Sequence, residues 1–207
     1  MTGGNAQSER ERLMRALRAR HPGLREALAA DTRITALHRG ERHEFRSRAD
    51  LAGQALRLMW VSDAFLALCL YRLKARLQAR GVPLLPRLAH RAAMMLAQVS
   101  IGDPVIVHPG VYIVHGQVVL DGLIEVHSGA VISPWVTVGL RAGNVQGPTV
   151  GPNVSIGTGA KLIGPITVGA GAKIGANAVV VDDVAAGSTV VGAPARPVSV
   201  KSASPGA

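Results

Sequence analysis

Histidine is the residue type in this chain best suited to acid–base or metal chemistry, because an imidazole exchanges its proton near neutral pH. Three of the seven histidines lie in the C-terminal half, at His108, His115 and His127, and none follows them. The single cysteine, Cys69, lies in the apolar run FLALCLYRL, which favours a buried small hydrophobe over a reactive thiol. One cysteine excludes an internal disulfide and favours a reduced, cytoplasmic setting. The fold therefore decides which histidines face a substrate.

A six-residue repeat predicts the architecture around these histidines. One set of aliphatic residues recurs every six positions: Val150, Ile156, Leu162, Val168, Ile174 and Val180. A second set follows each of these by four positions: Val154, Ala160, Ile166, Ala172, Ala178 and Val184. A period of six fits neither an α-helix nor a simple strand. It is typical of a parallel β-helix, in which short strands wind into coils and stack aliphatic residues inward.

The register of the repeat extends upstream to Ile101 and predicts about five coils. The inward positions expected there are Ile101, Val107, Ile113, Val119, then Val126 after a step of seven, Ile132 and Val138. Several glycines directly follow inward residues, and we expect glycine's backbone freedom to be needed there for sharp corners. These glycines are Gly102, Gly139, Gly151, Gly157, Gly169 and Gly175.

The register also identifies exceptions. His115 comes two residues after Ile113 and is expected to point outward. Asn144 falls where the next aliphatic residue is due, and a polar side chain cannot stack in that core without a large cost. We therefore expect residues 140–148 to form a loop extruded from the coil, and such loops often carry function.

The N-terminal half has the apolar spacing of helices. Residues 8–39 are expected to form one or two helices with a break at Pro22-Gly23, and residues 49–80 and 84–98 further helical stretches. The predicted fold class is mainly β with an α-helical N-terminal region. We expect a helical domain at 1–98, a β-helix domain at 99–198 and a disordered tail at 199–207. The helices would cover the open end of the β-helix, which otherwise leaves strand edges unpaired.

The net charge of +10 lies entirely before Ser100, where 18 Lys and Arg face 8 Asp and Glu. The arginines alternate with Leu and Ala without interleaved aromatic residues, which favours a solvated helix face over a nucleic-acid surface. Some of this charge could attract an anionic ligand such as a coenzyme phosphate. No signal peptide or membrane span is expected, because Arg57, Asp63 and Arg72 interrupt the longest apolar segment.

Beyond the repeats, two segments carry a family resemblance. YRLKARLQARGVPLLPRLAHRAAMMLAQVSIG and IGANAVVVDDVAAGSTVVGAPAR resemble the left-handed β-helix acyltransferases, and within them the serine acetyltransferase branch. The resemblance spans about two thirds of the chain. It implies left-handed winding, against the usual right-handed preference of parallel crossovers. It also implies acetyl-CoA as co-substrate and a homotrimer with sites between subunits.

The catalytic histidine of that branch falls on His115, in YIVHGQ. The resemblance implies that its neutral imidazole takes a proton from an acceptor hydroxyl as that hydroxyl attacks the thioester. The aspartate that orients the histidine in the branch is replaced here by Ser100. Asp103, Asp121 and Glu125 are the nearest acids in sequence, and the sequence does not choose among them.

The residues that hold serine in the branch also differ. A second aspartate is replaced by Val114, and an Arg-His pair in the loop corresponds to Gln146 and Gly147. A zwitterion needs paired charges when it is desolvated. The departures therefore favour an uncharged hydroxyl, on a sugar or a secondary metabolite, over free L-serine.

The resemblance also suggests which residues bind the acceptor and coenzyme A. The acceptor is expected to contact Gln117, Trp135, Arg141 and Asn144. Coenzyme A is expected in a groove between coils, where small residues allow close approach and two cations could meet phosphates. Its expected contacts are Gly157, Thr158, Gly159, Ala160, Lys173, Ala176 and Arg196.

A metal site is not expected. The γ-class carbonic anhydrases share this fold and bind zinc through three histidines. His115 and His127 are twelve residues apart and could stack on one edge, but the tight His-x4-His spacing and a later histidine are absent. His108 and His127 are therefore interpreted as corner residues.

The sequence leaves three functions open. The leading hypothesis is an acetyl-CoA-dependent O-acetyltransferase with a sugar or secondary-metabolite acceptor and His115 as general base. The first alternative is a serine O-acetyltransferase of cysteine biosynthesis. The second is a non-catalytic trimeric scaffold, which the loss of the aspartate at Ser100 would favour.

Overall fold

Five helices precede the strands in the computed structural model, which describes residues 3–198. The helices are α1 (Gly3–Arg20), α2 (Leu24–His38), α3 (Arg48–Val61), α4 (Asp63–Ala79) and α5 (Leu85–Ala97). The expected break at Pro22-Gly23 separates α1 from α2. The stretch over 49–80 is divided at Ser62, whose Oγ accepts a hydrogen bond from the Phe65 amide at 3.3 Å and caps α4. The predicted tail 199–207 lies outside the described residues.

Fifteen short strands form three sheets. The first sheet contains β1 (Val99–Ile101), β4 (Val118–Leu120), β7 (Thr137–Gly139), β10 (Lys161–Ile163) and β13 (Val179–Val180). The second contains β2 (Ile106–Val107), β5 (Leu123–Val126), β8 (Gln146–Val150) and β11 (Thr167–Val168). The third contains β3 (Tyr112–Ile113), β6 (Val131–Ile132), β9 (Ser155–Ile156), β12 (Lys173–Ile174), β14 (Thr189–Val191) and β15 (Arg196–Pro197).

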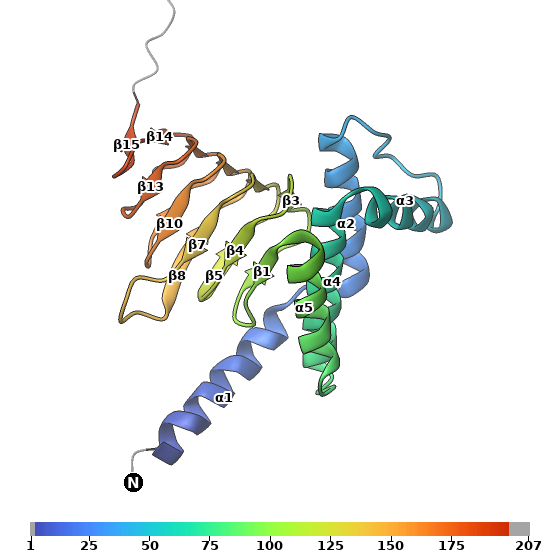
Figure 1. The fold of residues 1–207 in the computed structure, drawn as a ribbon, viewed down its shortest axis with the longest axis horizontal. Helices are drawn as coiled ribbons and strands as arrows, with labels where there is room; N and C mark the ends of the chain where they lie inside the picture. The colour runs from blue at the N-terminus through green and yellow to red at the C-terminus, as the bar shows by residue number, and fades with distance from the viewer. Residues whose placement is uncertain (1–2, 199–207) are drawn as a thin grey trace, which may run out of the picture.

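Successive strands pass from one sheet to the next, so the chain winds into a three-sided coil (Figure 1). Strand partners within each sheet are parallel, apart from the antiparallel pair β14–β15. The five strands of the first sheet correspond to the five predicted coils. Both aliphatic sets from Val150 to Val184 are buried in the coil interior. The predicted mainly-β fold with an α-helical N-terminal region is confirmed.

The register predicted between Ile113 and Val126 is wrong by one residue. Val119 is 40% exposed, whereas Val118 and Leu120 on either side are fully buried. Leu120 pairs with Ile101 in the previous coil, so the step of seven lies between Ile113 and Leu120. Gln117 takes up the extra residue in a left-handed conformation, with φ of 61°. The apolar run VVL fits either register, and the packing of this turn against the helices selects one.

The glycines that follow inward residues are needed for a different reason from the one expected. Gly157 and Gly169 do not adopt the left-handed conformation, which the coil uses at other corner positions such as Gly159. A Cβ on Gly157 would lie 2.7 Å from the Ala176 nitrogen, and one on Gly169 only 2.5 Å from the Ala186 nitrogen. These positions require glycine because the next coil passes too close for a side chain.

The helices cover the first coil, as predicted (Figure 1). Side chains from α4 and α5, among them Leu68 and Ala93, belong to the same buried cluster as the coil interior. Arg72 of α4 is buried, unlike the solvated arginines expected there, and its Nε lies 2.9 Å from an oxygen of buried Asp31 in α2. Arg72 also donates to the His108 carbonyl at 2.8 Å, so one buried ion pair joins two helices to the coil.

The extruded loop is shorter than the predicted 140–148, because β8 begins at Gln146. Asn144 is exposed within it, as expected, and its Oδ1 accepts a hydrogen bond from the Gln146 amide at 2.8 Å. Among residues 3–198, no helix combines the length and apolar character that a membrane crossing requires.

Candidate active site

His115 is exposed at the corner between β3 and β4, beside a cleft of about 490 Å³. The cleft lies where the helices meet the first coil. Its walls are Arg39 after α2, residues 61–64 where α3 ends and α4 begins, residues 96–98 at the end of α5, and residues 115–117 of the corner itself. The prediction that His115 points outward agrees with this placement, whereas its catalytic role stays a prediction.

The shape of the His115 corner depends on Gly116. A Cβ there would lie 1.8 Å from the carbonyl oxygen of Ala97, at the end of α5. The backbone amides of Gln117 and Val118 donate to the carbonyls of Ala97 and Gln98, each at 3.2 Å. The corner is therefore attached to the helix end, and this attachment sets the position of His115.

Two charged side chains that the sequence did not indicate line the same cleft. Asp63 lies in the first turn of α4, next to the capping residue Ser62. Arg39 follows α2, and its Nε is 2.9 Å from an oxygen of Glu41. The Ser-Asp pair could have signalled a helix start at Ser62, but nothing local signals that Arg39 reaches this cleft.

The three acids closest in sequence to His115 face elsewhere. Asp103 lies 3.1 Å from the Lys74 ammonium, and Glu125 binds Arg20 and His108. Neither these two nor Asp121 lines the cleft, where Asp63 is the only carboxylate among the described lining residues. Among the side chains described, those of residues 12–198, none forms a hydrogen bond with the His115 ring. Ser100 is half-buried on β1, opposite Val119.

The corner that carries His115 is repeated in the later coils, because each coil turns from the third sheet to the first at this edge. Trp135 occupies it one coil later and is 59% exposed. Thr158 follows in the next coil, and its Oγ1 donates to the Pro134 carbonyl at 2.9 Å. The Asn177 amide then donates to the Thr158 carbonyl at 2.8 Å. We call this column the His115 edge.

Most of the expected coenzyme contacts lie on the His115 edge. They are Gly157, Thr158, Gly159, Ala160 and Ala176, all in coils beyond His115. Lys173 and Arg196 are exposed on strands β12 and β15 of the third sheet, next to this edge in the chain. Arg196 lies 3.2 Å from an oxygen of Asp182, so its charge is partly engaged.

The expected acceptor contacts are not brought together within one chain. Gln117 lines the His115 cleft, but Trp135, Arg141 and Asn144 do not. Arg141 and Asn144 lie between β7 and β8, at the corner from the first sheet to the second. They therefore lie at a different corner of the coil from His115.

His127 does not stack on His115. It stacks instead on His108, with ring centroids 4.5 Å apart and planes 9° from parallel. Both follow strands of the second sheet, at a different corner from His115. The proposed pairing of His115 and His127 on one edge is therefore wrong, because they follow strands of different sheets.

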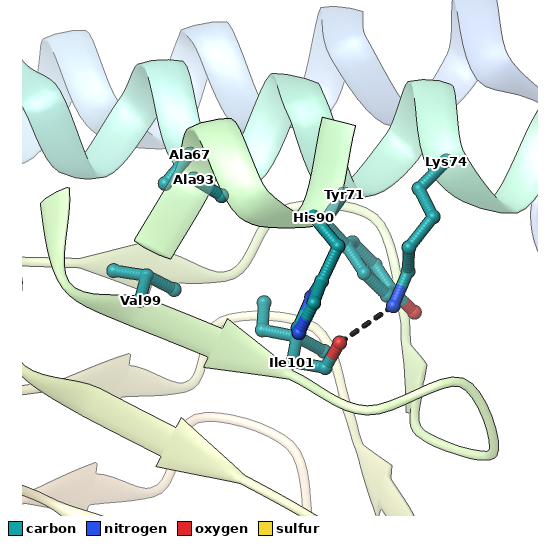
Figure 2. Close-up of a pocket in the computed structure, with 7 residues that line it drawn as sticks. All are labelled: Ala67, Tyr71, Lys74, His90, Ala93, Val99 and Ile101. Carbon is teal, nitrogen blue, oxygen red and sulfur yellow. Dashed lines mark hydrogen bonds between the residues drawn. The ribbon is translucent and has the colours of Figure 1, made fainter. Parts of the chain in front are cut away.

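A smaller pocket lies under α4 and α5 and is a packing feature. Figure 2 shows Tyr71, His90 and Lys74 above Ile101, with the Lys74 ammonium donating to the Ile101 carbonyl at 2.6 Å. Its volume is about 10 Å³, the scale of a single water molecule. It leaves no room for a substrate.

Comparison with known proteins agrees with this architecture. Residues 147–182 match the family described as bacterial transferase hexapeptide (six repeats). No curated protein sequence matches the chain.

Several serine acetyltransferases are among the solved structures with the same fold. The soybean apoenzyme is 29% identical, with a TM-score of 0.71 over 87% of this chain and 71% of its own. The Neisseria gonorrhoeae enzyme, solved in complex with serine, is 27% identical, with a TM-score of 0.69 over 84% and 68%. The Brucella abortus enzyme, solved in complex with coenzyme A, is 24% identical, with a TM-score of 0.70 over 83% and 66%. These matches support an acyltransferase with a left-handed β-helix, as predicted.

Proposed function

We propose that this chain is an acetyl-CoA-dependent O-acetyltransferase in which His115 is the general base. The imidazole accepts the proton of an acceptor hydroxyl while its oxygen attacks the thioester carbonyl. The C–S bond then breaks, the proton passes to the departing sulfur, and acetyl ester and free CoA thiol remain. The single observation that carries the proposal is an exposed His115 that opens into a cleft, on the fold of serine acetyltransferases.

We propose a small hydroxy amino acid of the serine type as acceptor. The cleft around His115 contains the guanidinium of Arg39 and the carboxylate of Asp63. A zwitterion buried in such a cleft needs one charge of each sign. The structural neighbours also favour serine, so the serine alternative replaces an uncharged acceptor as our leading assignment.

An uncharged hydroxyl remains the second candidate, because the coil itself lacks acids at the expected places. Val114, directly before His115, is half-buried and apolar, and the other expected place is taken by Ser100 on β1. If Arg39 remains paired with Glu41 when substrate binds, only Asp63 is left to meet a charge.

We place coenzyme A along the His115 edge. Thr158 is exposed there between the half-buried Gly157 and Gly159, and the exposed Lys173 on β12, the strand that leads into the next corner of this edge, is the candidate to meet a phosphate. We further propose a homotrimer in the cytoplasm, with the 140–145 loop of one subunit approaching the His115 edge of another.

Release of CoA thiol from acetyl-CoA tests the catalytic assignment. With acceptor present, His115→Ala should lower the rate by at least about 100-fold, the usual contribution of a general base. The matched control is His43→Ala, an exposed histidine between α2 and α3 that lies outside the cleft. Full activity in His115→Ala would disprove the role of His115.

A comparison of acceptors tests the substrate. L-serine should give O-acetylserine, and Arg39→Gln or Asp63→Asn should raise its KM more than they lower kcat. Exposed Arg33 and Glu26 on α2 supply the controls Arg33→Gln and Glu26→Gln. Turnover of sugars or simple alcohols with none of L-serine would instead select the second candidate. Failure to bind coenzyme A would select the non-catalytic scaffold.

A further inference from the structure

We propose that His108, Glu125 and His127 form a binding site for a divalent metal ion of the zinc class. The site is separate from the His115 cleft and does not depend on the proposed acetyl transfer. It departs from the expectation that no metal is bound.

The β-helix register places the three side chains together. Ile106 pairs with Glu125 and Val107 with Val126 in adjacent strands of the second sheet, so His108 and His127 come level at the strand ends. Val126 is fully buried, and the alternation along β5 therefore turns Glu125 and His127 to the outer face. The His108 amide donates to the Val126 carbonyl at 2.8 Å and holds the two coils in this register.

The donor atoms lie close to the spacing that a tetrahedral ion needs. Nε2 of His108 lies 2.7 Å from Oε1 of Glu125, and Nε2 of His127 lies 3.8 Å from the same oxygen. All three donors lie within 4.8 Å of one another. Ligands at zinc bond lengths in a tetrahedron are separated by about 3.3 Å, which falls between the two measured distances. Small rotations of the two stacked imidazole rings would bring the three donor atoms to this spacing.

The chemistry of the set is that of zinc. Two imidazole nitrogens and one carboxylate oxygen form a common set of protein ligands for zinc with a fourth position open. The side chains are 33%, 22% and 33% exposed for His108, Glu125 and His127, so an ion and one water molecule can reach them.

Arg20 completes the arrangement from the end of α1. Its Nη2 lies 2.6 Å from Oε2 of Glu125, the carboxylate oxygen that does not face the histidines. This contact turns Oε1 toward both rings, as hydrogen bonds outside the ligand set commonly do at metal sites. Arg20 is therefore a positioning residue. A metal here would also strengthen the attachment of α1 to the coil.

Titration of the metal-free, untagged full chain with Zn²⁺ or Co²⁺ tests the site. We expect one tight ion per chain by calorimetry, and a Co²⁺ visible spectrum of a four-coordinate nitrogen and oxygen site. Zn²⁺ should raise the melting temperature by about 5 °C. His127→Ala and Glu125→Gln should each weaken binding by at least about 100-fold, and Arg20→Gln by about 10-fold.

His43→Ala and His115→Ala are the controls, and both should leave binding unchanged. Glu125→Gln retains the size of the side chain, so its circular dichroism and folding should match the unaltered protein even if a histidine variant misfolds. Absence of tight binding in the unaltered chain overturns the proposal. So does binding that survives in the His108→Ala, His127→Ala double variant. The cluster would then be a hydrogen-bonded histidine–glutamate pair without a metal.

Discussion

The amide of Gln117 donates a hydrogen bond to the Ala97 carbonyl at 3.2 Å, and this bond attaches the His115 corner to the end of α5. Gly116 lies between Gln117 and His115 and leaves no room for a Cβ against that carbonyl. Gly116→Ala should therefore push the corner away from α5. We expect a loss of about 2–4 kcal/mol in the free energy of unfolding and a large loss of acetyl transfer. Urea unfolding and CoA thiol release measure the two effects.

Gly53→Ala provides the matched control for that substitution. Gly53 lies within α3, where an added Cβ meets nothing within 4 Å. Alanine favours a helix over glycine, so this variant should be stabilised by about 0.5–1 kcal/mol and remain active. If Gly116→Ala behaved like Gly53→Ala, the contact with Ala97 would not determine the corner.

The buried pair of Asp31 and Arg72 predicts an asymmetric response to mutation. Asp31→Ala leaves the Arg72 guanidinium buried without its counter-ion, which should cost about 3–5 kcal/mol in the free energy of unfolding. The double variant Asp31→Leu, Arg72→Met should recover part of this loss, because no charge then remains buried. Recovery should be incomplete, since Asp31 also accepts the Gly110 amide and Arg72 donates to the His108 carbonyl. Urea unfolding of the three proteins measures the difference, and a double variant no more stable than Asp31→Ala would contradict the prediction.

The repeat in the sequence was sufficient to predict the β-helix, because inward residues recur at a fixed period in the chain. It misplaced Val119 because neighbouring Val118 and Leu120 are equally apolar, and only the contact of Gln117 with α5 distinguishes the registers. The outward position of His115 could be predicted for the same reason as the fold. Arg39 and Asp63 could not, because helices distant in sequence bring them to the cleft.

The histidine–glutamate cluster, by contrast, was within reach of the repeat. The spacing of His108, Glu125 and His127 along the chain resembles no common metal motif. Their approach depends on the pairing of β2 with β5, which sets Val107 level with Val126. The predicted inward positions already place these two valines one coil apart, because the step of seven lies between them in either register. His127 was paired with His115 on a spacing of twelve residues, although the ring beside it is His108, one coil earlier.

Cys69 should be unreactive in the folded protein. Burial raises the pKa of its thiol to about 12, so only a minute fraction is thiolate at neutral pH, and the thiolate is the nucleophile. We expect modification by a thiol reagent at pH 7.5 to be slower in the native protein than in urea by at least about 100-fold. Equal rates in the two conditions would show that α4 opens readily around Cys69.

His21 predicts a loss of stability in mild acid. Burial, and then the charges of Arg72 and Lys74, lower the pKa of His21 from 6.5 to about 4. The unfolded chain therefore binds a proton between these pH values that the folded chain does not, and the folded state loses stability as pH falls through that window. The contribution of neutral His21 to the free energy of unfolding is fully present above pH 6.5. Because His21 is only partly shielded from solvent, we expect a loss of about 1–2 kcal/mol by pH 4.

His21→Phe removes this titration while filling most of the same space. Nε2 of His21 is buried without a hydrogen-bond partner in the described residues, so phenylalanine leaves no new polar group unpaired. The variant should match the original protein near pH 7.5 and be more stable at pH 5, with His43→Phe as the exposed control. Burial also lowers the pKa values of His90 and His127. The unfolding free energy of the variant should therefore still depend on pH, but less steeply than that of the original protein. An unchanged dependence of the unfolding free energy on pH in His21→Phe would exclude His21 as the main source of acid sensitivity.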